Sequence, residues 1–421
     1  MINELISPKR RIQQFSNNAA FFCAVAFMVF IPISTALMNV FIFLTFTFFL
    51  LAGNLKNHII IAWKNPVSKI AFILFFLLII SLNWTIDSSE AMGILKKYNE
   101  LWYIAFMLPL FDSNRRRSIG INAYLLSMSV VLIGVYLVFF EIILPIEYSV
   151  KGHKQSFTLD GGFASHVITN ILMSFTMFIA AQKVIFSRLL LKLPYLILFI
   201  FSFYYVLFIS TGTSGQILAL TLIILFIVQH TGVRSVLFIP IIFGLIAVTA
   251  IINKSYLSEI SQNDSIQFQI EKLQVRYHHM VSTDTAGNNT RPRIYFNTIK
   301  LIRHSPWFGS GVGSYEEAFR SRLPESYKLA SIAKKNPHNE FLMISVQLGL
   351  VGLLLLLYLF YVQGTSSDKL TEKEQKFIAQ GLVVLIIIGC MGNSMILDSR
   401  EGHFWAFFSA LLFSSLNKEL Q

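Results

Sequence analysis

Charged residues and cysteines are both scarce in this chain. Only 13% of its 421 residues are charged, whereas 55% are hydrophobic. A soluble domain cannot bury that much apolar surface, so the composition excludes a soluble protein and favours a polytopic membrane protein. The two cysteines, Cys23 and Cys390, lie far apart in apolar segments. We therefore expect free thiols and no disulfide.

Several chemical signatures are also missing. The sequence has no His-Glu-x-x-His, no paired cysteines and no Asp-x-Asp in an outer loop, so we expect neither a metal site nor a cofactor. The net charge of +12 comes without any nucleic-acid-binding motif. We expect no nucleic acid partner, because basic residues in short loops set membrane topology and contact anionic lipid headgroups.

Long apolar runs are what the sequence has in abundance. They predict an all-α, polytopic integral membrane protein with about twelve transmembrane helices and one large periplasmic loop. The expected spans are 18–35, 37–53, 67–83, 101–112, 119–144, 162–182, 190–210, 214–230, 233–252, 338–362, 377–397 and 402–416. The chain then divides into helices 1 to 9 (1–252), a loop or cap (253–336) and helices 10 to 12 (337–421).

Basic residues in the short loops predict the orientation of these helices. With twelve spans, the clusters at 9–11, 56–69, 115–117, 183–192 and 369–376 fall on one side. That side should be cytoplasmic, together with both termini. The 253–336 loop then faces the periplasm. Its basic residues outnumber its acidic ones, which makes an anionic ligand plausible beside the simpler reading of a solvated loop.

Two parts of the long loop carry recognisable patterns. Residues 294–303 have helical spacing and are followed by Pro306. The segment from Gly309 to Gly313 resembles a phosphate-binding loop only superficially, because it lacks a preceding strand and the Lys-Ser/Thr ending. We expect a flexible turn there. Aromatic residues scattered through the loop favour an ordered cap.

The first candidate for chemistry is His338, where the long loop meets an apolar helix. Pro337 is expected in the first turn of that helix, with Asn336 as its cap. A neutral imidazole there would suit a general base. By residue type alone, an interfacial histidine wetted by headgroups is the favoured alternative. Arg291 and Arg293 are candidate phosphate ligands, although two surface arginines are the favoured reading by residue type.

Weaker candidates lie in the other outer segments. The polar turn 210–216 contains Thr213 and Ser214 and is either a ligand-facing turn or a plain hairpin. Lys96 and Lys97 could contact an anionic group. His166 is expected within a span, where ionisable residues are unusual. The segment Asp398-Ser-Arg-Glu401 is expected to form a salt-bridged turn.

The spacing around His338 resembles that of a known family. His338-Asn339, nine residues, Gly349, two residues and Gly352 is similar to a pattern of bacterial O-antigen ligases. Upstream, Arg291-x3-Tyr295 and Pro306-Trp-Phe-Gly-Ser-Gly311 resemble the run that precedes the histidine in that superfamily. One departure is the turn at 210–216, where the family usually has an arginine and this chain has Thr213 or Ser214.

The resemblance implies a reaction and its site. A polysaccharide on undecaprenyl pyrophosphate would be transferred to a sugar hydroxyl of lipid A–core at the periplasmic face of the bacterial inner membrane. His338 would be the base, and Arg291 would stabilise the leaving pyrophosphate, with inversion and no metal. Arg293, Asn339, Lys96, Lys97, Thr213 and Ser214 would bind substrate.

Other functions remain open at this stage. An O-antigen polymerase and a protein O-oligosaccharyltransferase of the same superfamily use the same donor. A lipid or polysaccharide transporter also fits about twelve spans, but the sequence shows no inverted repeat and few intramembrane charges.

Overall fold

The computed structural model describes residues 8–144, 146–150, 153–159, 161–210, 212–232, 291–323 and 335–418. The span expected at 233–252 and most of the 253–336 loop lie outside these residues. The first half of the chain contains α1 (Pro8–Phe30), α2 (Thr35–Leu51), α3 (Leu55–Lys64), α4 (Pro66–Ile80), η1 (Ser81–Trp84), α5 (Ser88–Lys97), α6 (Glu100–Met107), η2 (Leu108–Phe111), α7 (Asn114–Phe139), β1 (Ile146–Val150), β2 (His153–Phe157), α8 (His166–Phe186), α9 (Leu189–Tyr204), η3 (Tyr205–Ile209) and α10 (Thr213–Thr231). The second half contains α14 (Arg291–His304), α15 (Tyr315–Arg322), α16 (Glu340–Ser367), α17 (Lys373–Gly392), α18 (Ser399–Phe413) and η6 (Ser414–Lys418).

The helical class expected from the sequence is confirmed, with a single antiparallel hairpin of β1 and β2 added in the described residues. Seven of the described helices are long and apolar enough to cross a membrane, or eight if α2 and α3, bent by 115°, form one span. The protein is therefore a multi-pass membrane protein, and the expected number of twelve spans is not confirmed by the described residues, which leave out the span expected at 233–252. The segments 101–112 and 402–416 are shorter helices in the structure.

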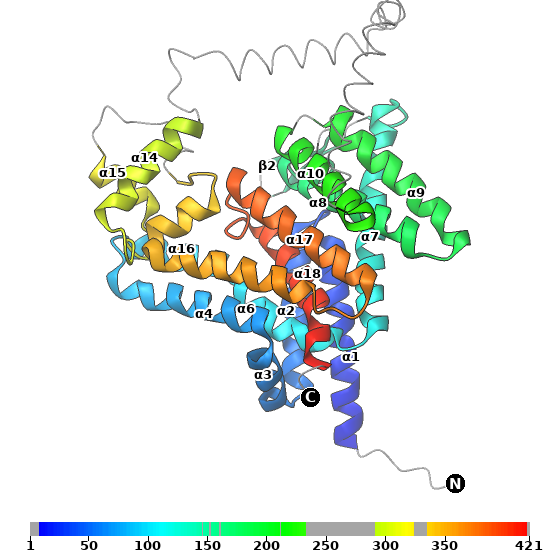
Figure 1. Cartoon of the computed structure of the whole chain (residues 1–421), viewed down its shortest axis with the longest axis horizontal. Coiled ribbons are helices and arrows are strands. Elements are labelled where there is room, and N and C mark those ends of the chain that lie inside the picture. The colour runs from blue at the N-terminus through cyan, green and yellow to red at the C-terminus, as the bar shows by residue number, and fades with distance from the viewer. Residues whose placement is uncertain are drawn as a thin grey trace, which may run out of the picture.

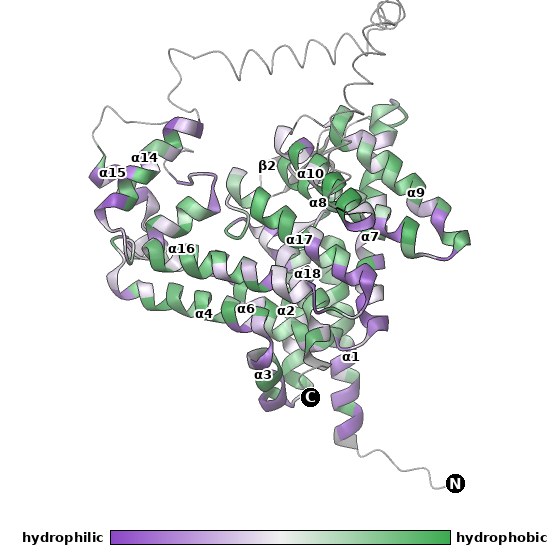
Figure 2. Ribbon diagram, in the orientation of Figure 1, coloured by the Kyte–Doolittle hydropathy of each residue, from purple (hydrophilic) through white to green (hydrophobic). Residues whose placement is uncertain are grey.

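Hydrophobic residues dominate the bundle, whereas α14 and α15 carry many hydrophilic ones (Figure 2). Large apolar side chains on α9, such as Leu189, Leu190 and Leu193, are exposed. In a membrane protein such a surface is solvated by lipid.

The C-terminal helix α18 lies at the centre of the bundle (Figure 1). It packs against α4, α6, α7, α8 and α17, and every residue from Glu401 to Phe413 is buried. Phe404 and Phe408 contact the rings of Phe175 and Tyr124, which come from α8 and α7. The N-terminal end of α18 therefore lies where several helices converge.

Local capping explains where important helices begin. The side chain of Asn65 accepts hydrogen bonds from the amides of Val67 and Ser68 and donates to the carbonyl of Phe413, so it caps α4 and ties it to α18. Pro66 follows at the first helical position, where no N–H is needed.

α16 is broken at Gly349, and the segment between α14 and α15 repairs the break. Gly349 has φ 64° and ψ −157°. The carbonyls of Val346 and Gln347 accept hydrogen bonds from the amides of Ser310 and Gly311. In return, the amides of Leu350 and Val351 donate to the carbonyls of Pro306 and Trp307. The groups freed by the break are thus paired, as burial requires.

The glycine segment that supplies these bonds is not the flexible turn expected from the sequence. Gly309, Gly311 and Gly313 all have positive φ. A Cβ on Gly311 would lie 2.3 Å from the Cα of Thr85, and one on Gly313 would lie 2.6 Å from the Cα of Ala91. The segment is therefore wedged between α16 and the η1–α5 region, because only glycine permits that approach.

Candidate functional site

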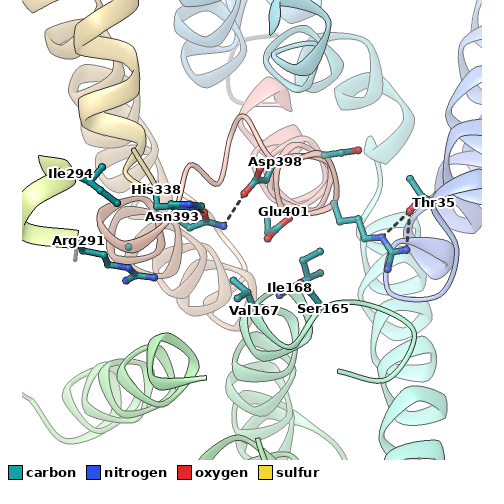
Figure 3. Close-up of a pocket in the computed structure, with 13 residues that line it drawn as sticks. Thr35, Ser165, Val167, Ile168, Arg291, Ile294, His338, Asn393, Asp398 and Glu401 are labelled. Carbon is teal, nitrogen blue, oxygen red and sulfur yellow. Dashed lines mark hydrogen bonds between the residues drawn. The ribbon is translucent and has the colours of Figure 1, made fainter. Parts of the chain in front are cut away.

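A cavity of about 710 Å³ opens at the end of the bundle where α18 begins (Figure 3). Its walls come from the starts of α2, α8, α14 and α18, the end of α17 and the segment before α16. The residues that line it are Thr35, Ser165, Val167, Ile168, Arg291, Ile294, His338, Gly392, Asn393, Asp398, Ser399, Arg400 and Glu401. The structure thus brings His338 and Arg291 to one cavity.

The backbone at His338 is held in an unusual conformation. His338 has φ 53°, in the left-handed region that non-glycine residues rarely occupy. Its amide donates to Oδ1 of Asn336 at 2.8 Å, and its carbonyl lies 3.3 Å from the hydroxyl of Tyr295. Such strain costs about 1–3 kcal/mol and persists where the surrounding structure enforces it, commonly at functional sites.

The helix after His338 begins later than the sequence suggested. α16 starts at Glu340, and its cap is Asn339, whose Oδ1 accepts the amide of Leu342 at 3.0 Å. The expectations that Pro337 starts the helix and that Asn336 caps it were wrong. Asn336 instead binds the His338 amide and the hydroxyl of Ser394, because His338 turns the chain just before the helix.

A chain of polar side chains leads from His338 to a carboxylate. Nδ1 of His338 lies 3.5 Å from Oδ1 of Asn393, and Nδ2 of Asn393 donates to Oδ2 of Asp398 at 2.8 Å (Figure 3). This orientation of the amide matches a proton on Nδ1, which leaves Nε2 with a free lone pair. Burial raises the pKa of Asp398, while the hydrogen bond from Asn393 and the charge of Lys97 act in the opposite direction.

Arg291 begins α14 and reaches toward the end of α17. A Cβ placed on Gly392 would lie 3.6 Å from Nη1 of Arg291 and 4.0 Å from Oγ of Ser214. Ser214, in the first turn of α10 where the expected arginine is missing, and Arg291 therefore both lie next to Gly392. Arg291 is exposed and lines the cavity, where a guanidinium can bind an anion through two parallel hydrogen bonds.

The other expected ligands have different positions. Arg293 is half-buried on α14 and does not line the cavity. Asn339 is occupied in capping α16 and in donating to the carbonyl of Met391. Lys96 and Lys97 are exposed in the last turn of α5, outside the cavity lining. Thr213 is exposed at the first position of α10.

Two weaker expectations have different outcomes. His166 is the exposed first residue of α8, a helix that is long and apolar enough to cross a membrane, so it lies at the end of that candidate span. The segment 398–401 does not form the expected salt-bridged turn among its described residues. Asp398 accepts from Asn393, and Arg400 donates to Oγ1 of Thr35 through Nε and Nη2 at 3.0 and 2.8 Å.

Sequence reasoning assigned no role to Glu340, Asn393 or Tyr295. Glu340 is fully buried, accepts from Tyr98 at 3.0 Å, and accepts the amides of Ile396 and Leu397 at 3.0 and 3.2 Å. It thereby fixes the segment that carries Asn393 and Asp398. The available signal in the sequence was a glutamate directly before an apolar run. An acid buried at that position needs hydrogen-bond partners, which points to a structural role.

The structure also shows how Tyr295 joins two parts of the site. Its hydroxyl lies 2.9 Å from the carbonyl of Met391 and 3.3 Å from that of His338. One helix, α14, therefore carries both Arg291 and a contact to the His338 backbone. Among the described residues, no group of three His, Cys, Asp or Glu side chains is placed to hold a metal ion.

Three comparisons with known proteins gave different results. A comparison with curated proteins finds no match. A chain from a solved peptidoglycan synthase complex is similar with a TM-score of 0.45 and 12% identity, over 84% of this chain and 97% of that one. Residues 196–357 match the family model described as O-antigen ligase, a range that includes Arg291, His338 and Gly349. This match covers less than half of the chain and supports the O-antigen ligase/polymerase superfamily and a glycosyltransferase-like enzyme, and the apolar helices make the chain a multi-pass membrane protein.

Proposed function

We propose that this protein transfers O-antigen polysaccharide from undecaprenyl pyrophosphate to a sugar hydroxyl of lipid A–core. The observation that carries the proposal is the meeting of Arg291 and the His338–Asn393–Asp398 chain at one cavity. A cation and a base are the two groups that this transfer needs, because the donor already carries a good leaving group.

In the proposed reaction, Nε2 of His338 takes the proton of the acceptor hydroxyl. The hydroxyl oxygen forms a bond to the anomeric carbon as the bond from that carbon to the pyrophosphate oxygen breaks. The electron pair leaves with the lipid pyrophosphate, whose charge Arg291 stabilises. Attack opposite the leaving group inverts the anomeric centre, and no metal is required.

Asp398 and Asn393 hold the imidazole during this step. When His338 gains a proton on Nε2, the Asn393 oxygen continues to accept from Nδ1, and the Asp398 carboxylate polarises that amide. The role of such an orienting group is to fix the tautomer of the base. Asp398 therefore acts through Asn393.

We propose that the enzyme lies in the bacterial inner membrane, with its site facing the periplasm and both termini in the cytoplasm. In support, basic residues gather at the end opposite the cavity. Arg116 donates to Asn18, Arg117 donates to Gln375 and Lys183 pairs with Glu374. Helix α8 runs from Ser165 at the cavity to this basic end, and basic ends of membrane helices face the cytoplasm.

An in vitro assay tests the proposal. Purified protein in proteoliposomes would receive the lipid-linked glycan donor with lipid A–core, a second donor glycan and a protein as competing acceptors. Attachment to lipid A–core is expected, whereas attachment to the second glycan or to the protein would identify a polymerase or a protein-glycosylating enzyme. Movement of the glycan across the bilayer with its carrier unchanged would mean a transporter.

His338→Ala tests the base within that assay. The variant should fold and lose transfer, since no other group in the proposed mechanism accepts the hydroxyl proton. His304→Ala, at the exposed end of α14, is the matched control and should transfer normally. Normal lipopolysaccharide ladders from cells with His338→Ala would refute the base.

A further inference from the structure

Glu401 differs from two other buried glutamates near the cavity in its hydrogen bonding. Glu100 pairs with Nδ1 of His403 at 3.0 Å, and Glu340 accepts from Tyr98 and two backbone amides. Glu401 is only 2% exposed, yet its side chain makes no hydrogen bond to another residue in the described part of the chain. Its carboxyl group interacts with its own backbone amide and with the charge of Arg400, and it lines the cavity, where its oxygens can accept hydrogen bonds from a ligand.

The position of Glu401 is tightly fixed by its neighbour. It lies in the first turn of α18, and a Cβ on Gly402 would come within 2.8 Å of the carbonyl oxygen of Ile396 and 2.9 Å of Cγ of Glu100. This close contact places the start of α18 against Ile396 and Glu100, with the carboxyl group of Glu401 at the cavity wall. Figure 3 shows it pointing into the space between the His338–Asn393 pair and Ile168.

Charge along the cavity separates two kinds of ligand. The Arg291 end attracts phosphate, whereas on the α18 side Glu401 and Asp398 present carboxyl oxygens, which offer a phosphate no positive charge, and the guanidinium of Arg400 there donates to Thr35. Sugar hydroxyls are hydrogen-bond donors that a carboxylate can accept without opposing charge. The Glu401 side of the cavity therefore suits the sugar that attacks, not the pyrophosphate that leaves.

We propose that Glu401 binds the acceptor, accepting hydrogen bonds from hydroxyls of a neutral sugar beside the hydroxyl that faces His338. This inference rests on the proposed function, because it divides that one cavity into a donor end and an acceptor end. It assigns Glu401 to acceptor binding and leaves the proton transfer to His338.

Binding to the protein in nanodiscs tests the proposal without relying on turnover. The probes are fluorescent lipid A–core, the same lipid after periodate cleavage of its vicinal diols, and the lipid-linked donor. Glu401→Ala should raise the Kd for intact lipid A–core by roughly tenfold to a hundredfold, as expected for lost hydrogen bonds to a charged group. Glu401→Gln, which keeps one acceptor oxygen, should lose less. The Kd for the donor should change by less than about twofold, which is smaller than the change expected from the loss of one such hydrogen bond.

Two comparisons make the result decisive. Periodate-treated acceptor should bind the wild type and Glu401→Ala equally weakly, and Glu90→Gln, at an exposed position of α5, should bind all probes as the wild type does. Unchanged acceptor affinity in both Glu401 variants would overturn the inference, as would a loss confined to the donor. If Glu401→Ala does not fold, the isosteric Glu401→Gln decides by the same criteria.

The proposed function and this inference can fail separately. A wild type that transfers glycan, with Glu401 variants that keep the wild-type acceptor KM, removes only the role of Glu401. A wild type that binds lipid A–core through Glu401 but never receives glycan on it removes the proposed reaction and leaves the binding site.

Discussion

Gly349 lies against the backbone of Trp307 so closely that a side chain cannot fit between them. A Cβ on Gly349 would be 2.4 Å from both the carbonyl carbon and oxygen of Trp307, and the φ of 64° is itself unfavourable for other residues. This contact joins α16, which follows His338, to the segment that follows α14. The segments that carry His338 and Arg291 are therefore joined by direct backbone contact into one frame, although they lie far apart in the sequence.

Gly349→Ala should destabilise the protein by roughly 2–4 kcal/mol, because the methyl group would push the backbone at Trp307 away from α16. Thermal unfolding in detergent would measure the loss. Gly364→Ala, in the same helix with open space around its Cβ, is the control and should leave the melting temperature unchanged or slightly higher. Equal melting temperatures for both variants would contradict the proposed frame.

Asn393→Ala should lower kcat by roughly tenfold to a hundredfold, as expected when a base loses the group that orients it. The acceptor and donor KM values should change little, since Asn393 acts through His338. Asp398→Asn should lower the rate for the same reason. Steady-state transfer kinetics would check both, and a loss seen only in KM would mean that these residues bind substrate directly.

Arg291→Ala should reduce transfer far more than Arg293→Ala, because only Arg291 lines the cavity. The expected effect of Arg291→Ala is a loss of transition-state stabilisation of about 3 kcal/mol, close to a hundredfold in kcat/KM. Arg291→Lys should recover part of it, since a lysine keeps the charge but not the planar fork. Equal losses in the Arg291 and Arg293 alanine variants would mean that both cations serve the donor.

Glu340→Gln should destabilise the protein by about 1–3 kcal/mol, the cost of leaving buried hydrogen-bonding groups mismatched. Tyr98 already accepts from Nε2 of Gln347, so an amide at position 340 would place a second N–H against its hydroxyl. Transfer should fall as well, because the segment carrying Asn393 and Asp398 loosens. Thermal unfolding of Glu340→Gln would be measured together with the control variant Glu90→Gln. Equal melting temperatures for the two variants would show that Glu340 does not hold this segment.

Local patterns in the sequence predicted local structure well. Residues 294–303 had helical spacing, and the structure has α14 over Arg291–His304. The patterns failed where backbone conformation depends on distant contacts. The left-handed φ of His338 delays the start of α16 to Glu340, and the Gly309–Gly313 segment is rigid because it completes the hydrogen bonds of a helix break some 40 positions away.

The sequence by itself determined the membrane class, most helices and the choice of His338 and Arg291, because hydrophobic runs and motif spacing are properties of the chain alone. Only the tertiary structure decided which groups meet them. Asn393, Asp398 and Glu401 reach the cavity because α17 packs against α16 and because Glu340, at the start of α16, binds the segment before α18. Such contacts between helices leave no periodic signal in any one of them. The same packing places Ser214 beside Arg291, where the sequence showed only a missing arginine.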